Sequence, residues 1–421
     1  MCSVRAQDRA TLDMLVKKGI ITQAEADEAA KSAAVVVNPR TEAVKKLTIG
    51  GLLQIQYDWL NTHDQAAGAT QPPAVNQFMV RRANIDTAAN LGNGWIGQLG
   101  LNFGSRPVSP APPETGITQR RIRKAIISKT VDGFGVATVG YQKVSWGQEE
   151  NTSSSKLKTI ERSVVTFFFD GTYGGPTNGR LGYGSHHTGV FWDGTVPTLT
   201  GFTYGGAVTD GIQGISVANP GRRRTRLVYN KFAYWTYAGY EGKYTGLDYA
   251  VGVNLGYDSE ANSANSPIGL PAQTSAAYGY NPYVTFVYDR LTISSEFMQT
   301  VVESGRSNAD GDTSNAVPYG FIVAPSYLLT RQWELATRFS YLDTNGRGTR
   351  INPVDRNAQN TFDTRGFDDA WAVYCGFNFY IQGTAIELSA GYEYTQFLGR
   401  QTFPGGPFNG PGANVSGVYL S

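Results

Sequence analysis

The hydrophobic pattern of this chain changes its period near residue 47. In residues 47–59 the odd positions are apolar or glycine and most of the even ones are polar or glycine, in the order LTIGGLLQIQYDW. Residues 247–258, 333–341 and 385–394 show the same alternation. A period of two is typical of a β-strand with one apolar face and one polar face.

Alternating strands occur in soluble β-sandwiches as well as in membrane β-barrels, and two features favour the barrel. The segments run for about 10–14 residues, which exceeds the roughly 5–6 residues of a typical soluble strand and suffices to cross a bilayer at a tilt. Aromatic residues stand at the segment ends, among them Trp59, Trp95, Phe103, Trp333 and Phe379. Such residues form girdles at the two membrane interfaces of barrels.

The lengths of the connections alternate along the chain. About sixteen segments read as strands, near 47–60, 77–91, 95–104, 119–130, 134–146, 179–192, 199–208, 228–241, 247–257, 278–288, 291–302, 317–329, 333–343, 367–381, 384–396 and 412–421. Several links after even strands are short, and links after odd strands are long, as in 61–76, 105–118 and 147–178. Outer-membrane barrels have short turns at one rim and long loops at the other. We therefore predict an all-β fold, a closed antiparallel transmembrane β-barrel of about 16 strands.

Composition agrees with this fold and excludes other classes. The chain has 50 Gly and 12% aromatic residues, which suits strands joined by many turns. No run of 18 apolar residues occurs, so no transmembrane helix is predicted. With 36 basic and 34 acidic residues the net charge is only +2, which gives no global field for nucleic acid. Cys2 and Cys375 lack metal-ligand spacing, and we expect no cofactor.

Residues 1–46 differ from the rest of the chain. Val4-Arg5-Ala6 fits the small-residue pattern before a signal-peptidase site, and Thr22-Gln23-Ala24-Glu25 is a capping-box pattern that opens a helix. We expect a signal remnant followed by a helical periplasmic leader, with residues 47–421 forming the barrel. A weakly ordered leader fits this composition equally well.

The segment 147–178 is the candidate functional element. It begins GQEENTSSSKLKTIERSVVTFFF, which is polar, then basic, then aromatic. It is too long for a hairpin turn, and we predict that it folds back inside the barrel and narrows the bore. Because a pore selects by width and charge at its narrowest point, we expect Lys156, Lys158, Glu161 and Arg162 to line this constriction. The alternative is an external loop without a filter role.

The wall contributes further candidates. A charge on the lipid face at mid-depth costs about 2–4 kcal/mol, so charged residues of the strands are expected to face the lumen. This reasoning selects five residues: Arg82, Arg121, Arg123, Glu334 and Arg338. The same alternation puts Arg81 near the rim. A lumen charge that is paired with a neighbour would be neutral to transport.

A catalytic reading has little support. His186 and His187 are adjacent in a predicted strand, so their side chains face opposite sides and do not share a metal. The faint candidate for an outer-membrane lipase is Ser185 with His187. We therefore predict that the chain is not an enzyme.

Three motifs resemble those of the phosphate-selective porins O and P: Phe78-Met79-Val80-Arg81-Arg82-Ala83, Thr159-Ile160-Glu161-Arg162-Ser163 and the segment 333–343. The resemblance covers essentially the whole chain. It implies a homotrimer of 16-stranded barrels in the bacterial outer membrane whose third long loop constricts the pore. The arginine ladder of that family does not map onto this sequence position by position, so phosphate selectivity does not follow from the resemblance.

The leading hypothesis is an outer-membrane porin for passive diffusion of small hydrophilic solutes. Anions such as phosphate are expected from the wall together with the basic-leaning infolded loop. Its expected partners are outer-membrane lipid and lipopolysaccharide, small ions or solutes, two further copies of the chain, and periplasmic or cell-wall material through residues 8–46. The alternative is a structural barrel that anchors the envelope through this leader. The third hypothesis is a soluble two-domain β protein.

Overall fold

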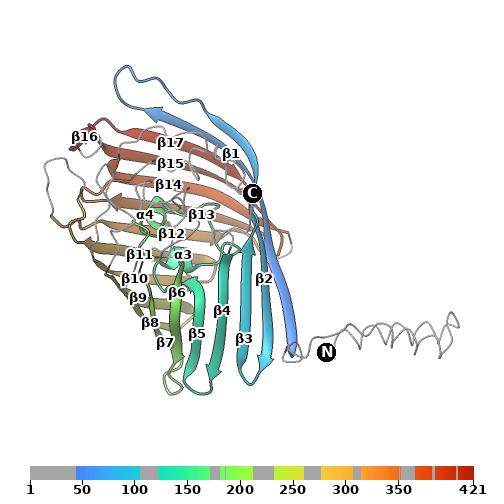
Figure 1. Ribbon diagram of the computed structural model, residues 1–421. Helices are drawn as coiled ribbons and strands as arrows, with labels where there is room; N and C mark the ends of the chain where they lie inside the picture. The colour runs from blue at the N-terminus through green and yellow to red at the C-terminus, as the bar shows by residue number, and fades with distance from the viewer. Residues whose placement is uncertain are drawn as a thin grey trace, which may run out of the picture.

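The computed structural model of the chain describes residues 44–104, 122–170, 181–184, 186–211, 232–259, 276–306, 314–349, 351, 366–381, 385–403 and 406–421. Within them, neighbouring strands are antiparallel and follow one another around a single sheet. The first strand, β1 (Lys46–Asp64), pairs with β2 (Val75–Gly92) and also with the last strand, β17 (Ala413–Leu420). The sheet therefore closes into a barrel (Figure 1).

The other strands complete the wall: β3 (Trp95–Asn102), β4 (Ile122–Val131), β5 (Gly135–Lys143), β6 (His186–Thr195), β7 (Phe202–Asp210), β8 (Phe232–Tyr244), β9 (Leu247–Asp258), β10 (Ala277–Tyr288), β11 (Leu291–Val302), β12 (Tyr319–Leu328), β13 (Trp333–Asp343), β14 (Phe367–Tyr380) and β15 (Glu387–Gln401). A further strand, β16 (Phe408–Gly410), spans only 3 residues and pairs with β15. Of the 17 strands in the sheet, sixteen therefore form the wall, and the predicted closed barrel is confirmed.

The alternation of the sequence separates two faces of the wall. In β1, the outward Leu53 and Ile55 are 68% and 60% exposed, whereas the inward Gln56 and Asp58 are 1% and 3% exposed. Exposed apolar side chains on one face suit a hydrocarbon solvent, because lipid tails do not penalise them.

The links between strands are short turns at one rim and long loops at the other. The link between β2 and β3 has positive φ at Asn93 (50°) and Gly94 (76°), and the link between β8 and β9 has it at Thr245 (45°) and Gly246 (82°). Two successive positive φ values are typical of a type I′ turn, whose twist matches that of the two strands it joins. The links after odd strands are long, which agrees with the predicted sorting of loop lengths.

Two short helices interrupt the link between β5 and β6: α3 (Gln148–Asn151) and α4 (Val164–Asp170). Figure 1 shows both within the outline of the barrel. Helix α4 contacts β12, β13 and β14. No helix among the described residues has the length and apolar character needed to cross a membrane.

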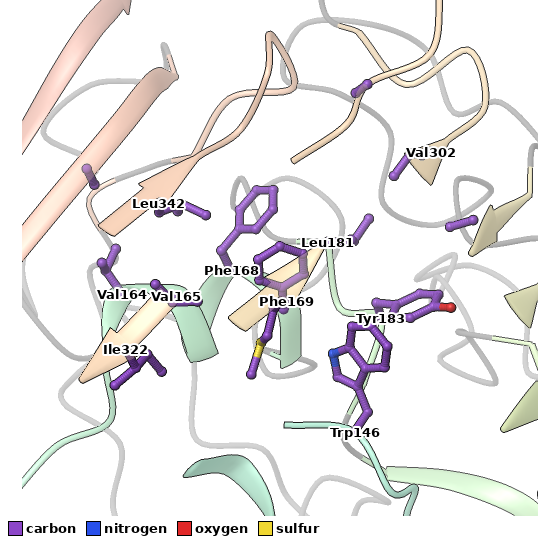
Figure 2. Packing of buried hydrophobic residues seen from close by; sticks show 14 of the residues in the cluster. Trp146, Val164, Val165, Phe168, Phe169, Leu181, Tyr183, Val302, Ile322 and Leu342 are labelled. Atoms are coloured by element: carbon purple, nitrogen blue, oxygen red, sulfur yellow. The ribbon is translucent and has the colours of Figure 1, made fainter. Parts of the chain in front are cut away.

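An apolar core joins this link to the wall. Val165, Phe168 and Phe169 of α4 are fully buried and cluster with Ile322 of β12 and Leu342 of β13 (Figure 2). Burying a side chain of this size stabilises a fold by about 1.5–3 kcal/mol. The segment is therefore packed against one side of the lumen rather than left hanging in it.

The predicted leader falls almost entirely on residues 1–43, which lie outside the described residues, as do residues 171–178 of the predicted infolded segment. These parts of the domain prediction stay predictions.

A charge placed on the outward face should destabilise the barrel. Val251 of β9 is 39% exposed on that face, and V251R should lower the free energy of unfolding in lipid by about 2–4 kcal/mol. The control is A250R at the next residue, which faces the lumen opposite Glu241 of β8 and should be tolerated. Urea titrations of both variants in liposomes make the comparison, and equal losses would contradict the assignment of the two faces.

Candidate functional site

The link that follows β5, here called segment 144–184 and described at residues 144–170 and 181–184, enters the lumen directly after that strand. The backbone N–H of Gly147 donates to Asn281 Oδ1 of β10 (3.0 Å). The N–H groups of Gln148 and Glu149 donate to the two carboxylate oxygens of Glu296 on β11 (2.7 and 2.8 Å). These donors are among those a helix leaves unpaired at its start, so Glu296 fixes the first turn of α3 to the wall.

Arg338 of β13 connects the wall to the middle of the segment. Its side chain is only 1% exposed, and Nη1 donates to Glu149 Oε1 (2.6 Å) and Thr159 Oγ1 (2.9 Å). Nη2 donates to Glu393 Oε2 of β15 (2.6 Å). A buried cation requires such pairing, because one left without partners would be strongly destabilising.

The carboxyl of Glu149 is ionised in this setting. Burial acts to raise its pKa, but the guanidinium of Arg338 and hydrogen bonds from Thr166 and Ser163 outweigh burial and hold the pKa below its ordinary value. Glu149 and Arg338 therefore form a charged pair inside the barrel.

A second buried pair joins the segment to β2. Arg81 donates from Nε and Nη2 to the two carboxylate oxygens of Glu161 (2.5 and 2.8 Å), a bidentate geometry that fixes orientation as well as distance. Gln56 of β1 donates to the same carboxylate (3.1 Å). Burial opposes ionisation of Glu161, but the charge and hydrogen bonds of Arg81 outweigh it and hold the pKa at about 2.

The position of Arg81 corrects the sequence analysis, which placed it near the rim. The pairing of β1 with β2 shifts between Gln54, opposite Arg82, and Ile55, opposite Val80. Arg81 is therefore the extra residue of a β-bulge, which places two consecutive side chains on the same side of the sheet. Arg81 reaches Glu161, and Arg82 is 6% exposed and bonds to Gln54 on the inner face.

A second bulge has the same effect on β4. The pairing with β3 shifts between Gly100, opposite Lys124, and Leu101, opposite Ile122, so that Arg123 is the extra residue. Arg123 and Lys124 both line the lumen. In each strand the bulge falls at a pair of adjacent basic residues, which strict alternation would have split between lumen and lipid.

Lys158, also in the middle of the segment, fastens it to β13 and β14. Its Nζ donates to Glu334 Oε2 (2.9 Å) and to the hydroxyl of Tyr380 (3.2 Å). Its carbonyl accepts a hydrogen bond from Asn378 Nδ2 (2.9 Å). The glutamate side chain is 3% exposed and that of Lys158 is 43% exposed, so the lysine retains access to the lumen.

The opposite side of the segment borders an open cavity of about 620 Å³ against β1–β8. Four basic residues line it, against two acidic ones: Arg123, Lys124, Lys143 and Arg162 against Asp86 and Asp193. Residues 151–154 of the segment form its other border. The lining of this cavity therefore carries an excess of positive charge.

The cations of this cavity differ in how they are compensated. Arg123 Nη1 lies 3.3 Å from Asp86 Oδ2, and both side chains are partly exposed. Lys143 and Arg162 share the carboxylate of Glu150 (2.7 and 3.1 Å). Within the described part of the chain, no ion pair involves Lys124.

The predicted site residues therefore occupy different positions. Arg123 and Arg162 line the cavity; Lys158, Glu161, Glu334 and Arg338 bind the segment to the wall; Arg82 is buried in the wall. Lys156 borders a second cavity of about 110 Å³ between the segment and β11–β13. Arg121 and Ser185 lie outside the described residues.

Sequence reasoning missed Lys124 and Lys143 as lumen residues. A signal for Lys124 was present, because two adjacent basic residues within a membrane strand are costly unless a bulge turns both inward. No comparable signal marks Lys143. It is the last residue of β5, and it contacts Glu150 only because the segment folds back into the lumen.

Asp170, at the end of α4, is a buried acid, and among the described residues neither of its oxygens has a hydrogen-bond partner. A side chain at Gly147 or Gly184 would collide with its carboxyl. Burial raises its pKa well above the ordinary value, and the nearby charges of Glu150 and Glu296 raise it further. Asp170 is therefore neutral at the point where the backbone near Gly147 and the backbone near Gly184 both lie against its carboxyl.

Comparison with known proteins gives a family and a fold. The family model described as phosphate-selective porin O and P matches residues 51–396. The comparison of this chain with curated proteins found no match.

Solved structures of low sequence identity share the fold. The anion-selective porin from Comamonas acidovorans has 13% identity and a TM-score of 0.54, with 89% of this chain and 98% of that one covered. The outer-membrane channel DcaP of Acinetobacter baumannii has 9% identity and a TM-score of 0.55, with 89% and 96% covered. Pseudomonas putida OprB has 12% identity and a TM-score of 0.54, with 88% and 93% covered.

Loss of the Arg338 side-chain charge should loosen the segment. R338Q leaves Glu149 and Glu393 buried without this cation, and breaking a buried pair typically costs about 3–5 kcal/mol. We expect a lower unfolding temperature and a noisier single-channel current. The control is K243Q, since Lys243 pairs with Asp248 in an exposed site, and exposed pairs contribute little. An R338Q channel as quiet and stable as K243Q would contradict the anchoring role.

Asp170 should make stability fall as pH rises. The unfolded carboxyl ionises above about 3.8, whereas the folded one stays protonated until its raised pKa is reached, so folding becomes less favourable over that window. D170N does not titrate and should raise the unfolding temperature more at pH 8 than at pH 5. Calorimetry at both pH values tests this, with D248N as the exposed control. A gain independent of pH would count against the neutral buried acid.

Proposed function

The chain belongs to the phosphate-selective porin O and P family, and on that premise we propose that it is an anion-selective porin whose solutes pass the basic cavity beside segment 144–184. Family and barrel make it a porin of the bacterial outer membrane that lets small hydrophilic solutes diffuse. The family and the barrel fold are typical of a channel rather than of an enzyme, and we infer no catalytic role.

The observation that carries the proposal is the charge balance of the cavity. Its lining holds four basic and two acidic side chains, and Lys124 contributes a charge without an ion-pair partner among the described residues. Low-dielectric walls focus the field of such charges into the lumen and raise the local concentration of counter-ions. Selection by charge at a narrow point is the ordinary basis of pore selectivity.

The segment supports this selectivity by its position. Its apolar core and the pairs Arg81–Glu161, Lys158–Glu334 and Glu149–Arg338 hold it to the wall. We propose that it constricts the bore from that side. Of the predicted site residues, Arg123 and Arg162 then act on solutes directly, and Glu161, Glu334 and Arg338 act by holding the segment.

The proposal extends to assembly. The outward apolar face of the strands fits outer-membrane lipid, and the similar anion-selective porin shares this barrel. We propose a homotrimer in contact with lipid and lipopolysaccharide. The alternative, an envelope anchor through residues 8–46, draws no support from the described residues, which begin at residue 44.

Liposome swelling tests the function. Proteoliposomes are exposed to three solutes of similar size, one anionic, one neutral and one cationic. The proposal expects the anion to enter fastest and the cation slowest, and empty liposomes give the background. Equal rates for the three solutes, or faster entry of the cation, would overturn anion selectivity while leaving the porin activity in place.

Charge reversal at Lys124 should reduce the preference for anions. K124E changes the cavity by two charges, and at water-like screening each unit contributes about 1 kcal/mol to an ion at about 4 Å. The two units together amount to about 2 kcal/mol, so we expect the anion-to-cation permeability ratio, measured from reversal potentials in a salt gradient, to fall by about 30-fold. The matched control is K243E, a lumen lysine outside the cavity lining. Identical ratios in K124E and wild type would exclude Lys124 from the filter.

A further inference from the structure

Glu150 lies directly behind two of the cavity cations. Its Oε1 is 2.7 Å from Lys143 Nζ, and its Oε2 is 3.1 Å from Arg162 Nε. Both cations line the cavity, whereas Glu150 does not and is only 9% exposed. A solute in the cavity therefore meets the lysine and the arginine, with the carboxylate on their far side.

The backbone around Glu150 fixes these cations further. Arg162 Nη2 donates to the carbonyls of Glu150 (3.3 Å) and Thr152 (3.0 Å), and its Nε donates to that of Glu149 (3.3 Å). Lys143 Nζ also donates to the Glu150 carbonyl. The two side chains are thus held by carbonyl oxygens as well as by the carboxylate, and much of their placement does not depend on the Glu150 charge.

Glu150 keeps its charge at every pH at which the porin would work. Burial acts to raise its pKa, but the charges of Lys143 and Arg162 outweigh burial and hold the pKa at about 2. The other groups that face the cluster are His186, Glu296 and Asp170. The cluster of Lys143, Arg162 and Glu150 therefore carries one net positive charge where the two cations alone would carry two.

We infer that Glu150 acts through its charge on Lys143 and Arg162, and that it limits how tightly the cavity holds a permeating anion. The inference rests on the proposed anion selectivity. Conduction requires binding strong enough for entry and weak enough for release. Two fixed, partly dehydrated cations without a counter-charge would attract an anion strongly and delay its exit. A carboxylate behind them lowers the attraction without occupying the path.

The test measures single-channel conductance of E150Q and wild type in planar bilayers as potassium chloride is raised from low to high concentration. The variant removes one charge close to the path, and the expected result is a half-saturating concentration about fivefold lower. Maximal conductance should fall at the same time, because release becomes slower. The anion-to-cation permeability ratio should rise.

Two variants separate charge from structure. E150D keeps the charge with a side chain one methylene shorter and should saturate as wild type does, whereas D248N removes a carboxylate elsewhere in the lumen and should leave saturation unchanged. A structural role alone would make E150D resemble E150Q, and a loosened segment would raise conductance and lower selectivity; either result overturns the inference. So would an unchanged half-saturating concentration in E150Q.

R162Q keeps the inference testable if E150Q does not fold. It leaves Glu150 opposite Lys143 alone, so the half-saturating concentration should rise; no change would overturn the inference. Failure of the proposed function looks different, because wild-type protein would then show no preference for anions. A wild type that selects anions, together with an E150Q channel that saturates as wild type does, would remove Glu150 alone.

Discussion

The structure depends on one constraint, that a charge buried away from water inside the barrel must have a partner. Arg338 is almost fully buried and lies between Glu149 on the infolded segment and Glu393 on β15. Arg81 and Glu161 form the corresponding pair at β2. Separating either pair would leave a buried charge without a partner, which is strongly destabilising. The two pairs therefore hold the segment in one place. The apolar core around Phe168 and Phe169 then stabilises the segment in that same position.

This constraint divides the lumen into two sides. Helix α4 packs against β12–β14, and the open cavity lies toward β1–β8. Acidic residues of the segment are occupied mainly by cations of the wall, so the unpaired positive charge is left on the open side. The selectivity that we propose is therefore a consequence of how the segment is anchored, as well as of the number of basic residues in the chain.

Much of the fold could be predicted from the sequence, because hydrocarbon and water impose a period of two on every strand. The segments around Leu53, Val251 and Phe339 follow that period and appear as strands with the expected outward face. The partners within the lumen could not be predicted. Glu149 and Arg338 are 189 residues apart, and local spacing carries no record of such a contact. The bulges at Arg81 and Arg123 break the period itself, so strict alternation misplaced Arg81 and failed to include Lys124.

The zero-current potential of the unmodified protein across a potassium chloride gradient in a planar bilayer tests the central claim most directly. Potassium and chloride have nearly equal mobility in water, so the sign of the potential reports the charge of the path. A segment anchored on one side, with a basic cavity left open on the other, predicts the sign for chloride preference. A potential of zero, or one with the sign for potassium preference, would contradict the account.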